Sequence, residues 1–203
     1  MRALLLSLSL LSSAALAQQA CEVMAVSGEA QRIDGKALAV GDKLDVGTAL
    51  RTGAAGRVRL KFIDGSVLVL ADRSELRIAT FSAVAGQPRE AEFLLELGLV
   101  GQRVNPAPGG SWKVRTPTAV TAVRGTEFSV EVGDDRATAV LVKTGEVDVE
   151  PAGPQTRGIK PRYPLRLTKN LSGTRCDAKE CAEATAWAAD RVQRIEQRLG
   201  SLD

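Results

Sequence analysis

The chain of 203 residues contains no histidine, which limits the chemistry that it could carry out. Without histidine, Ser-His-Asp and Cys-His nucleophile pairs cannot form, and most zinc and copper sites lack their usual ligand. The closest carboxylate pairs are Asp134-Asp135, at a predicted hairpin tip, and Glu146 with Asp148, on alternate positions of a predicted strand. Both positions are typical of solvated surface charge. We therefore expect a protein that is not an enzyme and that holds no metal or cofactor.

Arg124 is the charged residue that most invites a functional interpretation, because it lies between apolar stretches directly before Gly125-Thr126. A buried guanidinium must be paired, and a corner in a β structure leaves carbonyl groups free. We therefore expect a structural role in which Arg124 caps turn carbonyls or pairs with a carboxylate such as Asp64. We expect Gly125 to provide the backbone shape of the corner and Thr126 a hydroxyl cap. A functional role for Arg124 is the open alternative.

A second candidate is a segment between positions 157 and 175 that carries basic residues and no acidic one. These residues are Arg157, Lys160, Arg162, Arg166, Lys169 and Arg175. One interpretation is a solvated strap that leads to a C-terminal helix. The other is a contact for an anionic partner, such as an acidic protein face, peptidoglycan carboxylates or lipid headgroups. The net charge of the whole chain is only +3, which gives no indication of nucleic-acid binding.

Residues 1–17 have the three-part pattern of a secretory signal peptide. A basic start at Arg2 precedes an apolar run from Ala3 to Leu11 and a small-residue cleavage site that ends at Ala17. The apolar run is too short for a retained membrane anchor, so we do not expect the chain to span a membrane. The pattern predicts a periplasmic or secreted protein.

Three cysteines, Cys21, Cys176 and Cys181, follow the predicted cleavage site. An oxidising compartment favours their pairing, and an odd number leaves one over. Closing the short loop between Cys176 and Cys181 costs the least chain entropy, so we favour that pair. Pairing of Cys21 with either of the others remains open.

The elements that must position these residues are short strands separated by glycine turns. From Arg57 to Ile63 apolar and charged residues alternate, the turn Asp64-Gly65-Ser66 follows, and the return strand 67–70 is apolar on both faces. A kink is expected at Gly98. This pattern predicts an all-β fold of stacked short strands, either a sandwich or a β-solenoid.

The chain ends in a predicted amphipathic helix at residues 177–200, with Asp177 as its N-cap. We expect this helix to cover an open edge or an end of the core. The predicted organisation is thus a signal peptide at 1–17, a β domain at 22–150, a turn-rich basic strap at 151–176 that could complete the β domain, and the helix.

The most distinctive stretch runs from Arg115 to Val132, RTPTAVTAVRGTEFSVEV. Thr116-Pro117 opens its first strand, because proline holds an extended entry. In its second strand, apolar residues that begin at Phe128 alternate with polar ones, so we expect one face to be buried and the other to be exposed to solvent. The two strands meet at Gly125, which indicates a corner between strands.

The pattern T-P-x-A-x-x-A-V-R-G-T-x-F-x-V in this stretch resembles the signature of the FecR domain family. Three further motifs follow the family order: G-D-x-L with L-x-T-G at Gly41 to Gly53, F-x-D-G-S at Phe62 to Ser66, and V-x-x-G-E-V-x-V at Val142 to Val149. The resemblance spans Val26 to Val149 and implies a stack of short β strands. The family's closing L-x-A-G-E step is blurred at Leu165 to Leu171. Members of this family are bacterial envelope domains best known as receivers of a signal from an outer-membrane transporter.

The resemblance implies a non-enzymatic, periplasmic binding module that holds a protein or peptidoglycan partner, with strand addition at a sheet edge as one binding mode. The best-known members also have a membrane helix and a cytosolic segment that controls a sigma factor. The sequence shows neither, so we do not expect this chain to carry a signal to a sigma factor by itself. The alternative is a structural envelope protein that forms homo-oligomers, or docks on a larger assembly, through its C-terminal helix.

Overall fold

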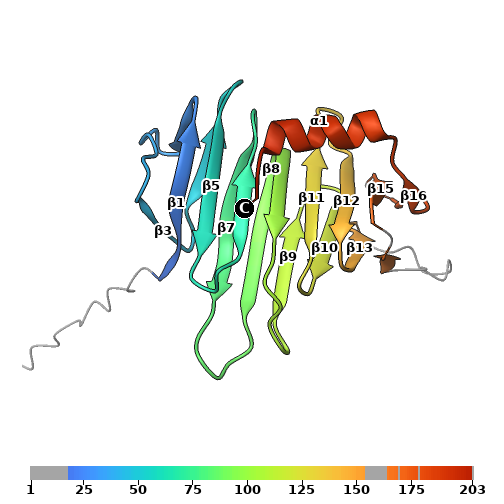
Figure 1. Ribbon diagram of the computed structural model, residues 1–203, viewed down its shortest axis with the longest axis horizontal. Coiled ribbons are helices and arrows are strands. Elements are labelled where there is room, and N and C mark those ends of the chain that lie inside the picture. The colour runs from blue at the N-terminus through green and yellow to red at the C-terminus, as the bar shows by residue number, and fades with distance from the viewer. Residues whose placement is uncertain (1–17, 154–163, 169, 178, 203) are drawn as a thin grey trace, which may run out of the picture.

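The computed structural model describes residues 18–153, 164–168, 170–177 and 179–202. The predicted signal peptide at 1–17 lies outside these residues. The described chain forms a two-layer β sandwich with one helix laid across one of its outer faces (Figure 1). The fold is therefore all-β with a single C-terminal helix, and of the two predicted architectures it is the sandwich.

Sheet A has the strand order β3-β1-β5-β6-β8-β11-β12-β15-β16. Its strands are β1 (Gln19–Ser27), β3 (Lys43–Asp45), β5 (Arg57–Phe62), β6 (Val67–Leu70), β8 (Glu90–Arg103), β11 (Glu127–Val132), β12 (Thr138–Thr144), β15 (Ser172–Cys176) and β16 (Thr185–Ala186). Sheet B has the order β2-β4-β7-β8-β9-β10-β13-β14. Its other strands are β2 (Ala30–Arg32), β4 (Ala49–Thr52), β7 (Glu75–Ser82), β9 (Ser111–Arg115), β10 (Ala119–Val123), β13 (Val147–Pro151) and β14 (Leu165–Leu167).

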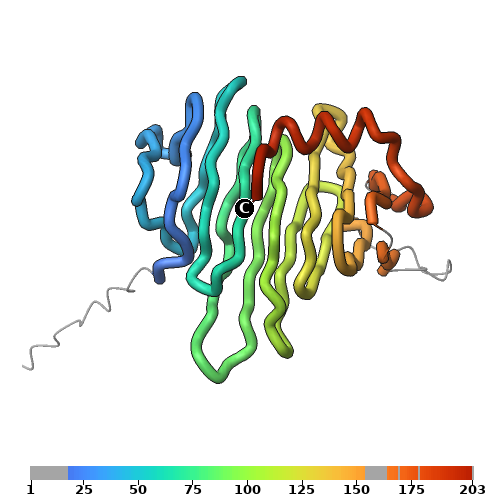
Figure 2. Tube along the Cα trace, viewed as in Figure 1, coloured from blue at the N-terminus to red at the C-terminus, as the bar shows by residue number. Residues whose placement is uncertain are grey.

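Strand β8 belongs to both sheets and bends between them at Gly98. Figure 2 shows the course of the chain through the molecule. The first part of β8 pairs with β7 and β9 in sheet B, and its second part pairs with β6 and β11 in sheet A. Gly98 has a φ of 91°, and a Cβ atom there would lie 2.1 Å from Ser74 Oγ. A side chain would therefore be strained and would collide, so the predicted kink requires glycine.

The core between the sheets is mostly aliphatic, with four aromatic side chains at its centre: Phe62, Phe81, Phe93 and Trp112. Their ring centroids lie 4.7–6.4 Å apart in tilted and edge-to-face arrangements. Such pairs add stability beyond the area that they bury. Because these rings come from both sheets, they hold the two layers together.

The sheet edges are short in the part of the chain that the structure describes. Strands β2, β3 and β14 have three residues each, and β16 has two. The outer edge of β2 is bonded to its own loop, since Arg32 N donates to Lys36 O and Leu38 N to Ala30 O. Short, covered edges offer little backbone to an added strand. A face of the sandwich is thus a better surface for a partner than an edge.

Helix α1 (Ala189–Leu199) crosses the outer face of sheet A (Figure 1). Its buried residues Val192, Ile195 and Leu199 form a second small core with apolar side chains of β6, β8 and β12 and of the residue after β6: Val69, Ala71, Leu99 and Leu141. A Cβ atom on Gly101 of β8 would lie 2.6 Å from Leu199 Cδ1. The lack of a side chain at Gly101 therefore leaves room for Leu199 at the end of the helix.

Ion pairs hold the same helix at its C-terminal end. Arg198 Nε donates to Asp72 Oδ1 at 2.8 Å, and Arg198 Nη1 donates to Glu131 Oε1 at 2.5 Å. Burial alone would lower the pKa of Arg198, but the hydrogen bonds to the two carboxylates raise it above its ordinary value. The guanidinium therefore stays charged and fixes the helix to the turn after β6 and to β11.

The predicted helix start at Asp177 is wrong, because α1 begins at Ala189. The Asp177 carboxylate instead accepts hydrogen bonds from the backbone N–H of Lys179 and of Glu180, at 2.7 and 2.9 Å, and closes a turn. Residues 185–186 then pair with β15 as β16. The helix also covers a sheet face and not an edge. Among the described residues, no helix has the length and apolar character needed to cross a membrane.

We predict that Ile195→Ala destabilises the protein by about 2 kcal/mol, because it opens a cavity between the helix and sheet A. The exposed neighbour Gln193 provides the matched control, and Gln193→Ala should leave the free energy of unfolding nearly unchanged. Both values come from denaturant unfolding. A helix that serves mainly to join protein copies would instead give an unchanged monomer stability and an altered oligomer size in Ile195→Ala.

Candidate functional site

The turn Asp64-Gly65-Ser66 is fixed by one buried arginine, Arg89, which is only 4% exposed. Arg89 Nη1 donates to Asp64 Oδ2 at 2.7 Å and to Asn105 O at 2.8 Å. The Asp64 carboxylate also accepts from Ser66 N and Ser66 Oγ, at 2.9 and 2.8 Å. A single buried charge pair thus joins the β5–β6 turn, the start of β8 and the loop that follows β8.

The guanidinium of Arg89 also lies 5.2 Å from the ring centroid of the buried Trp112. The indole Nε1 of Trp112 in turn donates to Gln102 Oε1 at 2.6 Å. Arg89 Nε and Nη2 have no hydrogen-bond partner among the described residues. Attraction between the cation and the aromatic face therefore adds to the ion pair with Asp64. The arginine is part of the core packing as well as of the loop network.

The loop after β8 contacts both glycine turns of the family motifs. Asn105 Nδ2 donates to Asp64 O at 3.0 Å, and a Cβ atom on Gly65 would lie 2.8 Å from Asn105 Nδ2. Gly125 has a φ of 63°, and a Cβ atom there would lie 2.8 Å from Pro106 Cγ. Two motifs that are far apart in sequence therefore pack against adjacent residues of one loop.

Thr126 fixes the neighbouring turn, as its expected role as a hydroxyl cap requires. The side chain is 2% exposed, and Thr126 Oγ1 donates to Glu146 O at 2.9 Å. Phe128, two residues later, is 2% exposed and lies in the main core. These two motif residues are therefore part of the structural frame, by which we mean the residues whose packing and hydrogen bonds hold the sandwich together.

The expected pairing of Arg124 with Asp64 is wrong, because Asp64 is paired with Arg89. Arg124 is exposed, and its side chain has no ion pair in the part of the chain that the structure describes. Val123 points into the core, so alternation along the strand turns Arg124 outward. We did not identify Arg89 from the sequence as a buried residue of this network. The same alternation could have done so, because Arg89 precedes the buried residues Ala91 and Phe93 by two and four positions.

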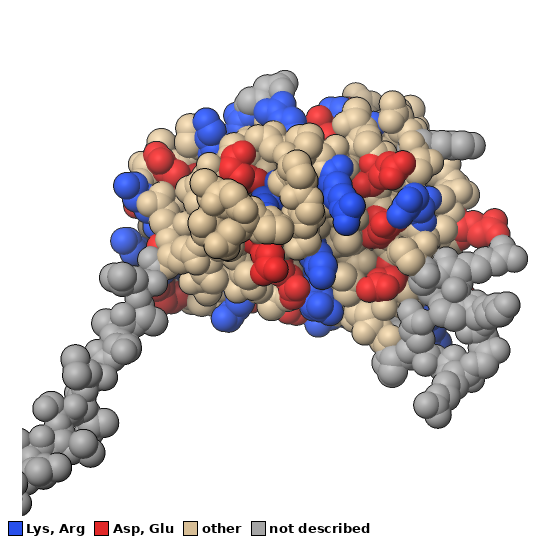
Figure 3. All heavy atoms as spheres, turned by 90° about the horizontal axis from the view of Figure 1, so that it is seen from below, with Lys and Arg blue, Asp and Glu red and all other residues tan. Residues whose placement is uncertain are grey.

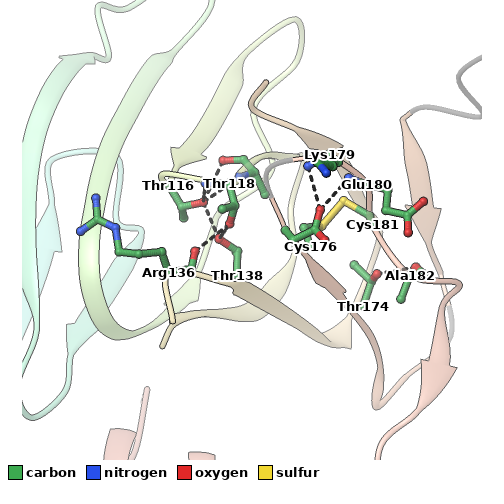
Figure 4. The surroundings of a disulfide bond; sticks show 12 residues. Thr116, Thr118, Arg136, Thr138, Thr174, Cys176, Lys179, Glu180, Cys181 and Ala182 are labelled. Carbon is green, nitrogen blue, oxygen red and sulfur yellow. Dashed lines mark hydrogen bonds between the residues drawn. A yellow bond between two sulfur atoms is a disulfide. The ribbon is translucent and has the colours of Figure 1, made fainter. Parts of the chain in front are cut away.

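Thr116 and Pro117 lie at the opposite end of β10, in its turn with β9. Thr116 Oγ1 donates to Ala119 O at 3.0 Å and shares a 2.6 Å hydrogen bond with Thr138 Oγ1 (Figure 4). Thr118 Oγ1 shares another, also of 2.6 Å, with the same Thr138 atom. All three threonines are buried, so this end of the motif is a structural hydroxyl cluster.

The disulfide Cys176–Cys181 lies close to this cluster (Figure 4). The third cysteine, Cys21, is free and buried. Burial, with a smaller effect from the charge of Asp45, raises the pKa of the Cys21 thiol to about 12. Cys21 is therefore a core residue in its neutral form, without the thiolate that a reactive cysteine needs.

The outer face of sheet B has a groove of about 490 Å³ beside Arg124. We call it the β10 groove and define it by Lys113, Ala122, Arg124, Glu146, Asp148 and Arg166, all of which line it. Ala122 of β10 lies between Lys113 of β9 and Asp148 of β13 in the strand register. The short alanine side chain thus forms a floor between two longer, charged neighbours.

Charge pairing within the β10 groove is incomplete. Arg166 Nε and Nη2 donate to the two carboxylate oxygens of Asp148 at 2.8 and 3.0 Å, and these bonds raise the pKa of Arg166. Arg166 Nη1 also lies 4.0 Å from Glu146 Oε2. Lys113 and Arg124 have no ionic partner among the described residues. We call the end of the sandwich that carries the Asp64 turn and the Gly125 corner the loop end. Seen from this end, charges of both signs lie among uncharged side chains (Figure 3).

The predicted basic segment is described only in part, since Arg157, Lys160, Arg162 and Lys169 lie outside the described residues. Arg166 lies in the β10 groove, and Arg175 forms an ion pair with Asp135. The structure therefore brings together Arg124, from the motif, and Arg166, from the basic segment. The described residues contain no group of three or more Cys, Asp and Glu side chains that could hold a metal ion.

We predict that Asp64→Ala destabilises the protein by about 3 kcal/mol, because it leaves the buried charge of Arg89 unpaired. Asp34 provides a matched control, since it also precedes a glycine in a turn but has a 63% exposed side chain. Asp34→Ala should cost less than about 1 kcal/mol. Thermal unfolding of both variants measures the difference, and equal effects would show that the Arg89 pair does not hold this end together.

Substitutions at two adjacent positions of the corner, Arg124 and Gly125, should affect the melting temperature differently. Gly125→Val forces a branched side chain into a positive φ and against Pro106, so it should lower the melting temperature strongly or prevent folding. Arg124→Ala should leave the melting temperature unchanged, because its side chain is exposed and unpaired. A destabilised Arg124→Ala would mean that the arginine supports the fold.

The chain is similar to known proteins in sequence and in fold. A family model described as FecR protein matches residues 48–148. A search of curated proteins found no match. Two crystal structures of a candidate anti-sigma factor from Parabacteroides distasonis ATCC 8503 have a similar fold, with TM-scores of 0.55 and 0.56 and sequence identities of 23% and 21%.

Each of these structures matches 72% of this chain, and the match spans 63% and 62% of their own lengths, which is less than two thirds. At such identities the likeness shows the fold alone. The matched family region contains the Asp64 turn, Arg89 and the Gly125 corner, which form one connected network at the loop end of the sandwich. The chain is therefore a FecR-domain protein.

Proposed function

We propose that this chain is a protein-binding module of bacterial envelope signalling that acts outside the cytoplasm and catalyses no reaction. The observation that carries the proposal is the contrast between the motif residues. The others are buried or partly buried in the frame, whereas Arg124 is exposed and unpaired among the described residues, beside a groove. An exposed charge in a rigid frame suits recognition of a partner.

The family and the fold support a regulatory role. The FecR match supports the proposal because the best-known members of this family receive a signal, and the similar crystal structures are of a candidate anti-sigma factor. Export is supported by the signal-peptide pattern at residues 1–17 and by the disulfide, which forms in oxidising compartments.

The alternative, a structural protein that assembles through its C-terminal helix, receives less support. The apolar residues of α1 are already buried against sheet A of the same chain, and Arg198 is paired there with two carboxylates. A helix used for assembly would have to leave these contacts first. The remaining surface, including the β10 groove, is compatible with a protein partner.

In-cell crosslinking tests the proposal. The full-length chain, with a C-terminal tag, is produced in its own bacterium and crosslinked in intact cells, with the Gly125→Val variant as a misfolded control. We expect recovery from the periplasmic fraction without residues 1–17, a defined crosslinked protein that is missing from the control, and altered transcription of a sigma-factor regulon when the gene is deleted. A cytoplasmic protein, or unaltered transcription together with no protein adduct, would overturn the proposal.

A further inference from the structure

We infer that the β10 groove binds an extended, acidic segment of a partner protein, with two carboxylates placed two residues apart against Lys113 and Arg124. The inference rests on the proposed function and adds the chemistry of the partner and the surface that it uses. It also assigns a role to the one motif residue that the frame leaves out.

The shape of the groove follows the strand at its floor. The outward residues of β10 are Val120 and Ala122, and Arg124 continues the same alternation after the strand ends. Their neighbours on β9 and β13 are longer, so the short side chains of β10 form a trough along the strand direction. An extended peptide has the same repeat as a strand, about 7 Å between side chains on one face. Its side chains can therefore follow the floor of the groove.

The charges of the groove select an acidic ligand. Lys113 lies opposite Ala122, and Arg124 lies one step further along the same face, so the two cations occupy successive levels of the trough. Neither has an ionic partner among the described residues. The carboxylate of Asp148, on the other wall, is already paired with Arg166. Glu146, which also lines the groove, lies 4.0 Å from the Arg166 guanidinium, so Lys113 and Arg124 are the groove charges without an ionic partner among the described residues. Both are cations, and a guanidinium suits two-point binding of a carboxylate.

A protein segment fits these observations better than a cell-wall polymer. The two cations lie on neighbouring strands, at successive levels along the strand direction, which matches the spacing of alternate peptide side chains. The short apolar side chain of Ala122, on the floor of the groove, leaves room for peptide side chains. Exposed ion pairs are weak and are screened by salt, so we expect an affinity that falls as ionic strength rises.

Nuclear magnetic resonance titration of the full chain, labelled with nitrogen-15 and purified after export, tests the inference. The probe is a short acetylated peptide in which Glu alternates with Thr, compared with the same peptide carrying Lys in place of Glu. We expect the Glu peptide to shift the amide signals of Lys113, Ala122 and Arg124. Arg124→Glu and Lys113→Glu should each weaken binding by about tenfold or more.

Arg77 provides the matched control for these variants. It is an exposed arginine on β7, on the outer face of the same sheet but away from the groove. Arg77→Glu should leave the affinity for the Glu peptide unchanged, and melting curves confirm that each variant is folded. Equal binding of the Lys peptide, or an affinity that does not respond to Arg124→Glu, would overturn the inference. Binding of a soluble peptidoglycan fragment in the groove without binding of the Glu peptide would also overturn it.

The in-cell crosslink separates this inference from the proposed function. A protein adduct that forms in wild-type cells and persists in the Arg124→Glu variant would leave the binding module intact and refute the groove as its contact. Absence of an adduct and of any transcriptional change in wild-type cells would refute the proposed function itself.

Discussion

The charge of Arg89 is buried between the two sheets, and the loop end of the sandwich is arranged so that this charge is paired. An unpaired guanidinium in that position would cost several kcal/mol, so Asp64, the Asn105 carbonyl and the Trp112 ring are all placed around it. These contacts fix the β5–β6 turn and the loop after β8. That loop in turn packs against Gly125. The corner at Gly125 therefore depends on the Arg89–Asp64 pair, although no residue of the corner belongs to that pair.

Because Asp64 is already paired with Arg89, Arg124 is not needed to stabilise the frame. The arginine extends to solvent at the end of β10 and lines the same groove as Lys113 and Arg166 on the outer face of sheet B. The opposite face of the sandwich is occupied by α1, and the described sheet edges are short. The β10 groove, in contrast, combines a rigid frame with two cations, Lys113 and Arg124, that are unpaired among the described residues, which is what a recognition surface requires.

Much of the fold could be predicted from the sequence, because alternation in segments such as 57–62 sets which side chains are buried. The division of strands between two sheets could not, since it depends on bends such as Gly98 and on contacts between distant segments. Arg124 was misassigned because a motif pattern does not say which way a side chain points. Its position two residues after Ala122 does, because alternate residues of a strand lie on the same face. The helix start was misplaced because Asp177 and Glu180 have a capping pattern that the structure uses in a turn beside the disulfide.

The claim on which the account depends is that Arg89 is the buried arginine of the loop end and Arg124 the free one. Hydrogen exchange of the arginine Nε–H groups, followed by nuclear magnetic resonance in the native protein, tests it most directly. The account predicts a slowly exchanging Nε–H signal that disappears in Arg89→Lys, and a rapidly exchanging one assigned to Arg124. A protected Arg124 together with a rapidly exchanging Arg89 would contradict the account.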